Sequence, residues 1–231
     1  MLVIHPLLLL GSLLGLAIAL WAQFRVRGNF KRWSNVRARS GLTGAEVARR
    51  ILDAHGLSHV PVELVPGKLT DHYDPTVRAV RLSEAVYHSD SVAAISVAAH
   101  ECGHAIQHKE AYGALVFRHR MVPVLNITSG AVPFLLLAGI FFKLSGLLLL
   151  GIIFFSVVVL FHLVTLPVEF NASSRAKVIM SSMNMISGAE EDRGVNKVLG
   201  AAAMTYVAGA VIALMELLQY ILLFILQQND D

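Results

Sequence analysis

The segment SVAAHECGHAIQHKE, residues 96–110, decides how the rest of the chain is interpreted. Small and apolar residues dominate its first half, and Ser91 is placed to cap a helix running from Val92 through His108. A membrane-spanning helix needs about 20 apolar residues. Polar side chains from Gln107 to Glu110 end this apolar run too early for a span. The segment therefore predicts a buried helix in a folded domain outside the bilayer.

Three residues of this helix, His100, Glu101 and His104, form an H-E-x-x-H pattern. Residues four apart lie on one helix face, so both imidazoles can point at one metal ion. Glu101, one position further round, can reach a water without binding the metal itself. The alternative is two helix histidines satisfied by hydrogen bonds, but burying His, Glu and His without a metal or partners is costly. We therefore expect one zinc ion, with Glu101 as the catalytic base.

Neither Cys102 nor His108 fits as a third ligand from the same helix. Cys102 lies on the opposite side from the two histidines and is expected to be a small buried thiol. His108 continues the histidine stripe but starts about 12 Å along the axis from His100, so three rings cannot converge on one ion. The third ligand is therefore expected from another segment.

Glu169, in LPVEFNASSRAK (residues 166–177), is the best candidate because it follows an apolar run on the same side of the membrane as the motif. His162 lies inside that run and is expected to be packed or hydrogen-bonded. His119 and Asp90 are expected on the same side of the membrane as the motif, but no predicted helix directs their side chains toward the metal. The acidic cluster 190–192 is interpreted as a solvated loop.

Four apolar runs are long enough to span a bilayer: Leu2–Ala22, Met121–Phe142, Leu144–Leu166 and Tyr206–Leu226. With 55% hydrophobic residues and a mean hydropathy of +0.63, the chain is too apolar for an ordinary soluble domain. The first run is expected to be a retained span, because its basic residues follow the apolar stretch, the reverse of a secretory signal.

Basic residues are concentrated from Arg25 to Arg39, directly behind the first span, and recur after the third. The positive-inside rule then predicts that both charged segments face the cytoplasm and both termini lie outside. The basic excess, a net charge of +3, is expected to contact anionic lipid headgroups near Arg25 to Arg39 and not nucleic acid. A single cysteine permits no intramolecular disulfide, in agreement with a reducing compartment.

Between the first two spans, the pattern predicts a helix, two strands and the motif helix. Thr43 and Glu46 form a capping box for a helix that ends near Gly56. VPVELVPG (residues 60–67) and TVRAVRLS (residues 76–83) are typical of strands, separated by turn-rich sequence. In the turn, residues 72–74 are expected either to offer an oxyanion donor or simply to form a turn held by Asp and Pro.

Several of these stretches together resemble the bacterial YugP-like neutral zinc metallopeptidases of the membrane, over about residues 28 to 215. The resemblance rests on TGAEVARRILDAHGL (43–57), on LTDHYDPTVRAVRLSEAVYHSDSVAAISVAAHECGHAIQH (69–108) and on LPVEFNASSRA (166–176). It implies a gluzincin-type peptidase with His100, His104 and Glu169 on zinc and Glu101 as base. One departure is Asn171, which stands where an acid is expected after the ligand.

The same resemblance suggests that RAVRLS, residues 78–83, is an edge strand beside the metal with which a substrate backbone could pair. An ordinary sheet strand is an equally good interpretation.

The expected fold class is an α-helical membrane protein with four transmembrane helices plus a small α+β cytoplasmic gluzincin-like zinc peptidase domain. The expected segments are transmembrane helices at 1–23, 121–143, 144–166 and 206–227, a catalytic domain at 24–120, a cytoplasmic segment with the third ligand at 167–205 and a tail at 228–231.

The expected function is that of an inner-membrane, zinc-dependent endopeptidase that hydrolyses peptide bonds of a protein or peptide substrate with a zinc-activated water. The alternatives are a non-catalytic, zinc-stabilised membrane scaffold or chaperone, and an intramembrane site-2-type protease. Neither the substrate nor the oligomeric state follows from the sequence. Glu216, inside the fourth span, is expected to be neutral and structural, with Ser156 as its candidate hydrogen-bond partner.

Overall fold

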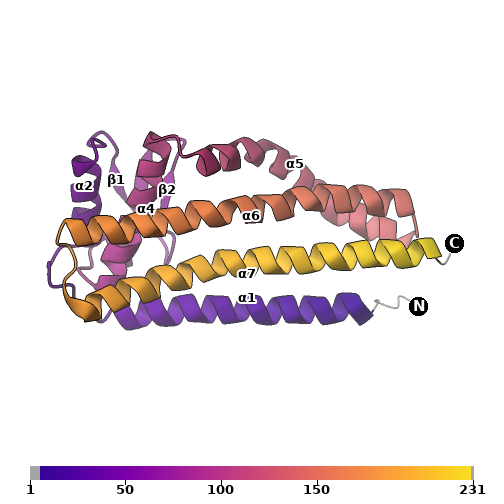
Figure 1. The fold of residues 1–231 in the computed structure, drawn as a ribbon, viewed down its shortest axis with the longest axis horizontal. Coiled ribbons are helices and arrows are strands. Elements are labelled where there is room, and N and C mark those ends of the chain that lie inside the picture. Colours follow the sequence, from indigo (N-terminus) through magenta and orange to yellow (C-terminus); the bar gives the residue numbers. More distant parts are fainter. Residues whose placement is uncertain (1–5, 230–231) are drawn as a thin grey trace. The chain divides into compact units, whose positions relative to one another are not determined.

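The computed structural model describes residues 6–229 and is mostly helical (Figure 1). Residues 2–5 of the first expected span and 230–231 of the expected tail lie outside the described residues. The helices are α1 (Pro6–Trp33), α2 (Gly44–Ala54), α3 (Glu84–Tyr87), α4 (Val92–Lys109), α5 (Gly113–Phe141), α6 (Ser145–Ser182) and α7 (Gly188–Asn229). The strands are β1 (Val62–Val65), β2 (His72–Asp74) and β3 (Ala79–Ser83).

The chain forms two compact units. The helical unit comprises Met1–Ala22, Val116–Leu166 and Thr205–Asp231, and the mixed unit comprises Gln23–Leu115 and Pro167–Met204. Helices α1, α5, α6 and α7 each contribute residues to both units, α5 only with its first three residues. All three strands belong to the mixed unit.

Within residues 6–229, four helices are long and apolar enough to cross a membrane: α1, α5, α6 and α7. The helical unit turns large apolar side chains outward, among them Ile127 at 71% exposure and Phe134 at 75%. Its own apolar cluster is small and is centred on α5 and α6, where Leu148 is fully buried against the backbone near Gly139. Exposed apolar surface of this extent is unfavourable in water and is expected in lipid. The structure thus supports a membrane protein with four candidate spanning helices.

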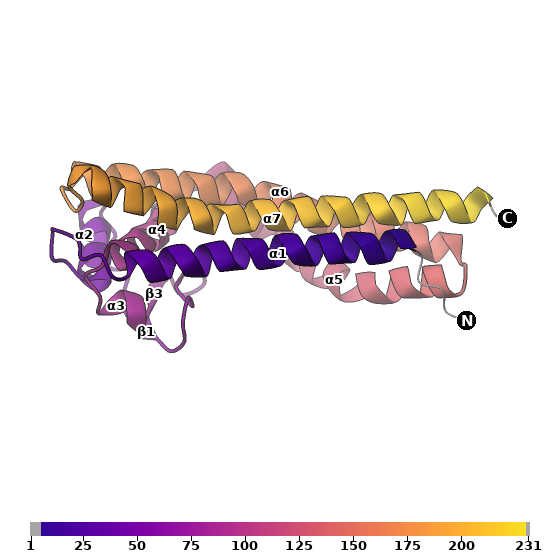
Figure 2. The ribbon, with the colours of Figure 1, turned by 90° about the horizontal axis from the view of Figure 1, so that it is seen from below.

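The core of the mixed unit forms where α2 and the sheet pack against α4, as both ribbon views show (Figures 1 and 2). The capping box at Thr43 and Glu46 is present, and α2 buries Val47, Ile51 and Leu52 completely, as expected. Ser91 accepts a hydrogen bond from the backbone N–H of Ala94 and so caps α4. These local signals fix the start of the motif helix.

The sheet differs from the expectation in having a third strand, and it decides between the two interpretations of RAVRLS. The strand order is β1-β3-β2, with β3 parallel to β1 and antiparallel to β2. The edge-strand interpretation of RAVRLS (residues 78–83) is therefore wrong and the ordinary sheet strand is confirmed, because β3 pairs with a strand on each side. Strand β2 was missed because it is three residues long and flanked by Asp71 and Pro75, which are typical of turns.

The acidic cluster 190–192 was wrongly interpreted as a solvated loop, because it lies in the first turns of α7. Glu191 is 3% exposed, and its carboxylate accepts hydrogen bonds from the backbone N–H groups of Arg39 and Ser187. A carboxylate at a helix start satisfies otherwise unpaired donors. Glu191 therefore connects the start of α7 to the segment that follows α1.

Inside the helical unit, the expected hydrogen bond between Ser156 and Glu216 is not formed. The Ser156 hydroxyl donates to the carbonyl of Ile152, one turn back in its own helix, at 2.9 Å. Glu216 is partly buried, and no hydrogen bond joins it to Ser156 in the structure of residues 6–229.

Candidate metal centre

Helix α4 places His100 and His104 on one face with their ring centroids 4.7 Å apart and the rings nearly perpendicular. Both side chains are mostly buried, at 12% and 13% exposure. The remainder of α4 is packed into the core through small and apolar residues, so the backbone that carries the two rings is held from several sides.

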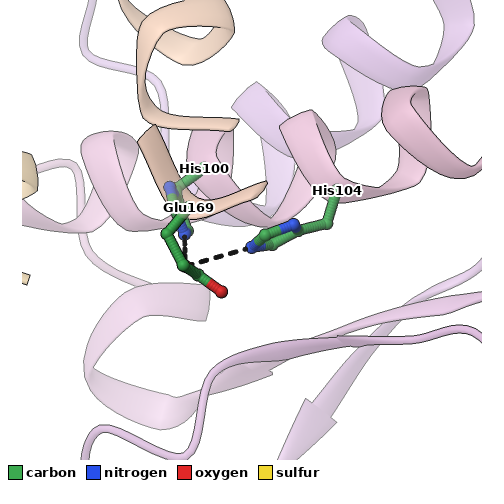
Figure 3. A group of neighbouring side chains, drawn as sticks. All are labelled: His100, His104 and Glu169. Atoms are coloured by element: carbon green, nitrogen blue, oxygen red, sulfur yellow. Dashed lines mark ion pairs between the residues drawn. The ribbon is translucent and has the colours of Figure 1, made fainter. Parts of the chain in front are cut away.

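Glu169 reaches the same point from α6 (Figure 3). Its Oε2 lies 3.3 Å from Nε2 of His100 and 3.5 Å from Nε2 of His104. One ligand atom from each of the three residues lies within 4.8 Å of the other two, so the group could hold a metal ion. The side chain of Glu169 is 3% exposed, which places the carboxylate in a site largely closed to water.

Gly103 allows α6 to come this close to α4. A Cβ atom at Gly103 would lie 3.2 Å from the Cα of Ala172 and 2.7 Å from its carbonyl oxygen, and the second distance is closer than real Cβ atoms approach other atoms. Ala172 lies between Glu169 and Ser173 on α6. The missing side chain at Gly103 therefore permits the Glu169 face of α6 to lie against the two histidines.

Ser173, four residues after Glu169 and on the same face of α6, contacts the other nitrogen of His100. Its hydroxyl oxygen lies 3.1 Å from Nδ1 of His100. If Nδ1 carries the proton and donates it to this hydroxyl, the lone pair of Nε2 is directed toward Glu169. Ser173 is 7% exposed, so water does not compete strongly for this contact.

The orientation of His104 is fixed by a chain of hydrogen bonds that begins at Arg175. Arg175 can only donate, and its Nε–H donates to Oδ1 of Asn171 at 2.8 Å. The same oxygen accepts from Nε2 of Gln107 at 2.9 Å, and Nε2 also donates to the carbonyl of Val168 at 2.8 Å. Oε1 of Gln107 is thereby left to accept from Nδ1 of His104 at 3.0 Å.

This chain, which we name the Gln107 relay (His104, Gln107, Asn171 and Arg175), places a proton on Nδ1 of His104. The lone pair of a neutral His104 then lies on Nε2, the atom beside Glu169. Asn171 needs only to accept hydrogen bonds in this arrangement, which an amide oxygen does. The asparagine at position 171, where an acid is expected, therefore still accepts the hydrogen bonds from Gln107 and Arg175.

Glu101 follows His100 directly on α4 and is 8% exposed. Its Oε2 accepts a hydrogen bond from the backbone N–H of Tyr73, in β2, at 2.9 Å. Within residues 6–229 its other oxygen, Oε1, has no hydrogen-bond partner. The missed strand β2 therefore holds the carboxylate by one oxygen and leaves the second available for a proton.

The other candidate ligands are occupied elsewhere in the mixed unit. Cys102 is fully buried, its thiol lies 3.6 Å from the carbonyl of Ala48, and burial raises the pKa of this thiol, so it stays protonated. Nδ1 of His108 lies 2.8 Å from the hydroxyl of Tyr73, and burial together with Arg78 lowers the pKa of His108. Asp90 pairs with Arg37.

His119 and His162 lie in α5 and α6 of the helical unit and are not members of the three-residue group. The turn expected at residues 72–74 is present only in part. Oδ1 of Asp74 accepts a hydrogen bond from the backbone N–H of Thr76, but residues 72–74 form strand β2, whose Tyr73 N–H donates to Glu101.

Comparison with known proteins gives consistent results. Residues 8–225 match the family model described as "Putative neutral zinc metallopeptidase". A curated relative, "Putative membrane protease YugP" of Bacillus subtilis (strain 168), is 57% identical over 220 residues, covering 95% of this chain and 97% of the relative. No solved structure matches the chain. The chain therefore belongs to the neutral zinc metallopeptidase family that the model defines.

Proposed function

We propose that the protein is a membrane-integral zinc endopeptidase in which His100, His104 and Glu169 hold one zinc ion and Glu101 is the general base. The observation that carries the proposal is the convergence of two imidazoles from α4 and a carboxylate from α6 within 4.8 Å, directly beside Glu101. Membership of a peptidase family and the membrane-protease relative support the same chemistry.

The donor set fits zinc. Two imidazole nitrogens and one carboxylate oxygen are a ligand set found in catalytic zinc sites, which keep a further position open. Both Nε2 atoms lie next to Glu169, while Gln107 and Ser173 contact the Nδ1 atoms. When bound, zinc supplies a Lewis acid that polarises a carbonyl oxygen and makes a water more acidic.

Residues of the protein carry out proton transfer, orient the ligands and limit the access of water. Oε1 of Glu101 takes a proton from the attacking water, and the same carboxyl group can then give it to the leaving amine nitrogen. The Tyr73 N–H holds Oε2 and so fixes the direction of the carboxylate. Ser173 and the Gln107 relay keep the imidazoles oriented, and the buried walls around Glu169 limit access of bulk water.

A structural metal site is the first alternative. Such sites normally close with four protein ligands, often including cysteine. Within the described residues the metal-binding group has three members, and Cys102 points to Ala48. An intramembrane site-2-type protease is the second alternative, and it requires the motif inside a spanning helix. The four candidate spans, α1, α5, α6 and α7, do not include α4. Both observations favour the endopeptidase.

We place the active site on the cytoplasmic face, because basic residues gather from Arg25 to Arg39 and again after residue 166. The headgroups beside that segment are expected to be anionic. Single cysteines in a Cys102→Ala background test the orientation with an impermeant thiol reagent on intact cells. Probes at residues 145 and 229 should be labelled and probes at 59 and 190 protected. The opposite pattern would place the active site outside.

The decisive test of the function is Glu101→Gln. The amide cannot accept the proton, so peptide cleavage should fall by at least about 10²-fold, while zinc content and folding stay at wild-type levels. Cleavage that persists in this variant would remove Glu101 from its role. Loss of zinc would instead identify Glu101 as a ligand. Comparing new peptide termini in cells that carry either form would also reveal substrates.

A further inference from the structure

Two adjoining hollows in the mixed unit are lined by cationic side chains from two helices. The larger measures about 530 Å³ and the smaller about 280 Å³, and both are lined by Arg25 of α1 and by Arg193 and Lys197 of α7. Arg32 adds a fourth cation to the smaller hollow. The first turns of α7 and the last turns of α1 run side by side here (Figures 1 and 2). The two helices thus form one cationic site.

The protein does little to neutralise the charges of Arg193 and Lys197. Among the described residues, Asp192 is the one acidic residue that lines either hollow, and its Oδ2 accepts a hydrogen bond from Asn196 at 3.2 Å. Across residues 6–229, neither Arg193 nor Lys197 forms an ion pair. Cations gathered in one place repel each other, so Arg193 and Lys197, which have no ion pair in the part of the chain that the structure describes, are expected to bind an external anion.

Trp33 supplies a second, independent observation. It lines the smaller hollow and is 4% exposed, yet its indole Nε1–H has no hydrogen-bond partner among the described residues. A buried donor without a partner is uncommon and costs free energy unless a ligand or water satisfies it. Its six-membered ring lies against Gly194 of α7, and the guanidinium of Arg32 lies 5.6 Å from the ring centroid.

The position of the two hollows along α1 and α7 indicates that they lie near the headgroup layer of a membrane. Arg25 is three residues past Ala22, the end of the first expected span, which is about 5 Å along a helix. Ala201, which lines the larger hollow, is five residues before Tyr206, the start of the fourth expected span, or about 8 Å. A headgroup layer is about 5 to 8 Å thick on each side of the hydrocarbon. The near ends of both hollows therefore lie at headgroup depth.

We propose that these hollows bind the phosphate of an anionic phospholipid, held by Arg25, Arg32, Arg193 and Lys197. Guanidinium groups match phosphate oxygens with paired N–H donors, and lysine adds a point charge. Basic pockets between helices at the membrane surface bind such headgroups. A bound lipid would hold the end of α1 to the start of α7, beside the Glu191 contact with Arg39.

The site can be tested without peptidase activity, so its failure would leave the proposed function standing. In purified, zinc-loaded Trp21→Phe protein, Trp33 is the remaining tryptophan. Phosphatidylglycerol added in detergent micelles should shift its fluorescence saturably and raise the melting temperature, whereas phosphatidylcholine should do neither. Inorganic phosphate at equal concentration should also do neither. Equal effects of inorganic phosphate would identify a soluble anion as the ligand and overturn the lipid assignment.

Two double variants that remove the same net charge distinguish a specific binding site from non-specific electrostatic attraction. Arg193→Gln with Lys197→Gln should weaken phosphatidylglycerol binding at least tenfold while zinc content stays unchanged. Arg27→Gln with Lys31→Gln, two exposed cations of α1 that line neither hollow, should bind nearly as wild type does. Equal loss in both variants would show diffuse surface electrostatics and overturn the proposal, as would the absence of saturable binding in the wild type.

Discussion

Helices α4 and α6 each supply half of the candidate metal centre, but they do so in different ways. In α4, His100, Glu101 and His104 stand within five residues, and the helix is capped and buried in the core of the mixed unit. In α6, Glu169 stands about two thirds of the way along a 38-residue helix whose first part is apolar. The α4 half is determined by local sequence, whereas the α6 half depends on how the helix packs against α4.

The difference shows that a metal centre can combine ligands fixed on one buried helix, here α4, with a ligand from a second helix that packs against it, here α6. The ligands on α4 are spaced by the helix itself, so their separation survives small shifts of other elements. Glu169 comes within reach because Gly103 admits the Ala172 backbone. Disturbing α4 should therefore remove the site, and disturbing the packing of α6 should weaken it.

The largest effect is expected from removing the α4 ligands. His100→Ala with His104→Ala should eliminate bound zinc, measured by metal analysis of purified protein, and should abolish peptide cleavage. Glu169→Ala should also weaken zinc binding strongly, but it leaves both imidazoles in place, so weak residual binding is expected. Zinc that is unchanged in the double variant would contradict the metal site as assigned.

Filling the gap at Gly103 should act on the contact between the helices without touching a ligand. In Gly103→Ala the new methyl meets the Ala172 backbone, which cannot rotate away as a side chain can. We expect a loss of about 1–3 kcal/mol in unfolding free energy and weaker zinc binding. Gly130→Ala is the matched control, since a Cβ there meets nothing within 4 Å. Equal stability and zinc affinity in both variants would show that the close approach does not matter.

The contrast between the helices also explains what the sequence predicted. The capping box at Thr43, the cap at Ser91 and the motif helix rest on local patterns, and the structure has all three. The four apolar runs correspond to the four candidate spans within residues 6–229. Glu169 was identified as the third candidate ligand because it follows an apolar run and because the chain resembles a known family. These features require little knowledge of packing.

Features that depend on packing were missed. Ser173 carries a weak signal, a polar residue one turn after Glu169, but nothing in the sequence showed that α6 continues as helix to Ser182. Strand β2 is held by pairing with β3 and by the hydrogen bond from Tyr73 to Glu101, neither of which is a local pattern. The same limit left RAVRLS open between an edge strand and an ordinary sheet strand, since strand order is set by which strands pair.

The Gln107 relay offers a milder way to disturb the site. Gln107→Leu keeps the side-chain volume roughly similar but removes the acceptor for Nδ1 of His104. The imidazole then has no partner to select its tautomer, and zinc affinity or activity should fall about 10- to 100-fold. Zinc affinity is measured by competition with a chelator.

Asn171→Asp is the control for the relay, because the carboxylate still accepts from Gln107 and Arg175. It should keep zinc affinity close to wild type, whereas Asn171→Leu should resemble Gln107→Leu. If Gln107→Leu binds zinc as tightly as wild type, the relay does not orient His104.

Cys102 and His108 share α4 with the ligands and should have far smaller effects. Cys102→Ala removes a buried thiol and should cost stability only, about 1 kcal/mol, with zinc content unchanged. His108→Ala removes a contact with the Tyr73 hydroxyl and should likewise keep zinc. Metal analysis that shows zinc loss in either variant would place that residue in the site.

The smallest effect is expected at Glu216, in the helical unit. Glu216 lies ten residues inside the fourth apolar run, about 15 Å along the helix from its start, and is partly buried. An ionised carboxylate is costly at such a depth, and Ser156, the partner expected from the sequence, donates its hydroxyl to Ile152 instead. We therefore expect Glu216 to be neutral and structural. Glu216→Gln should keep zinc and peptide cleavage at wild-type levels, because an amide can replace a protonated acid as a donor. If cleavage is lost while the protein stays folded and zinc-loaded, Glu216 takes part in a proton or substrate path through the spans.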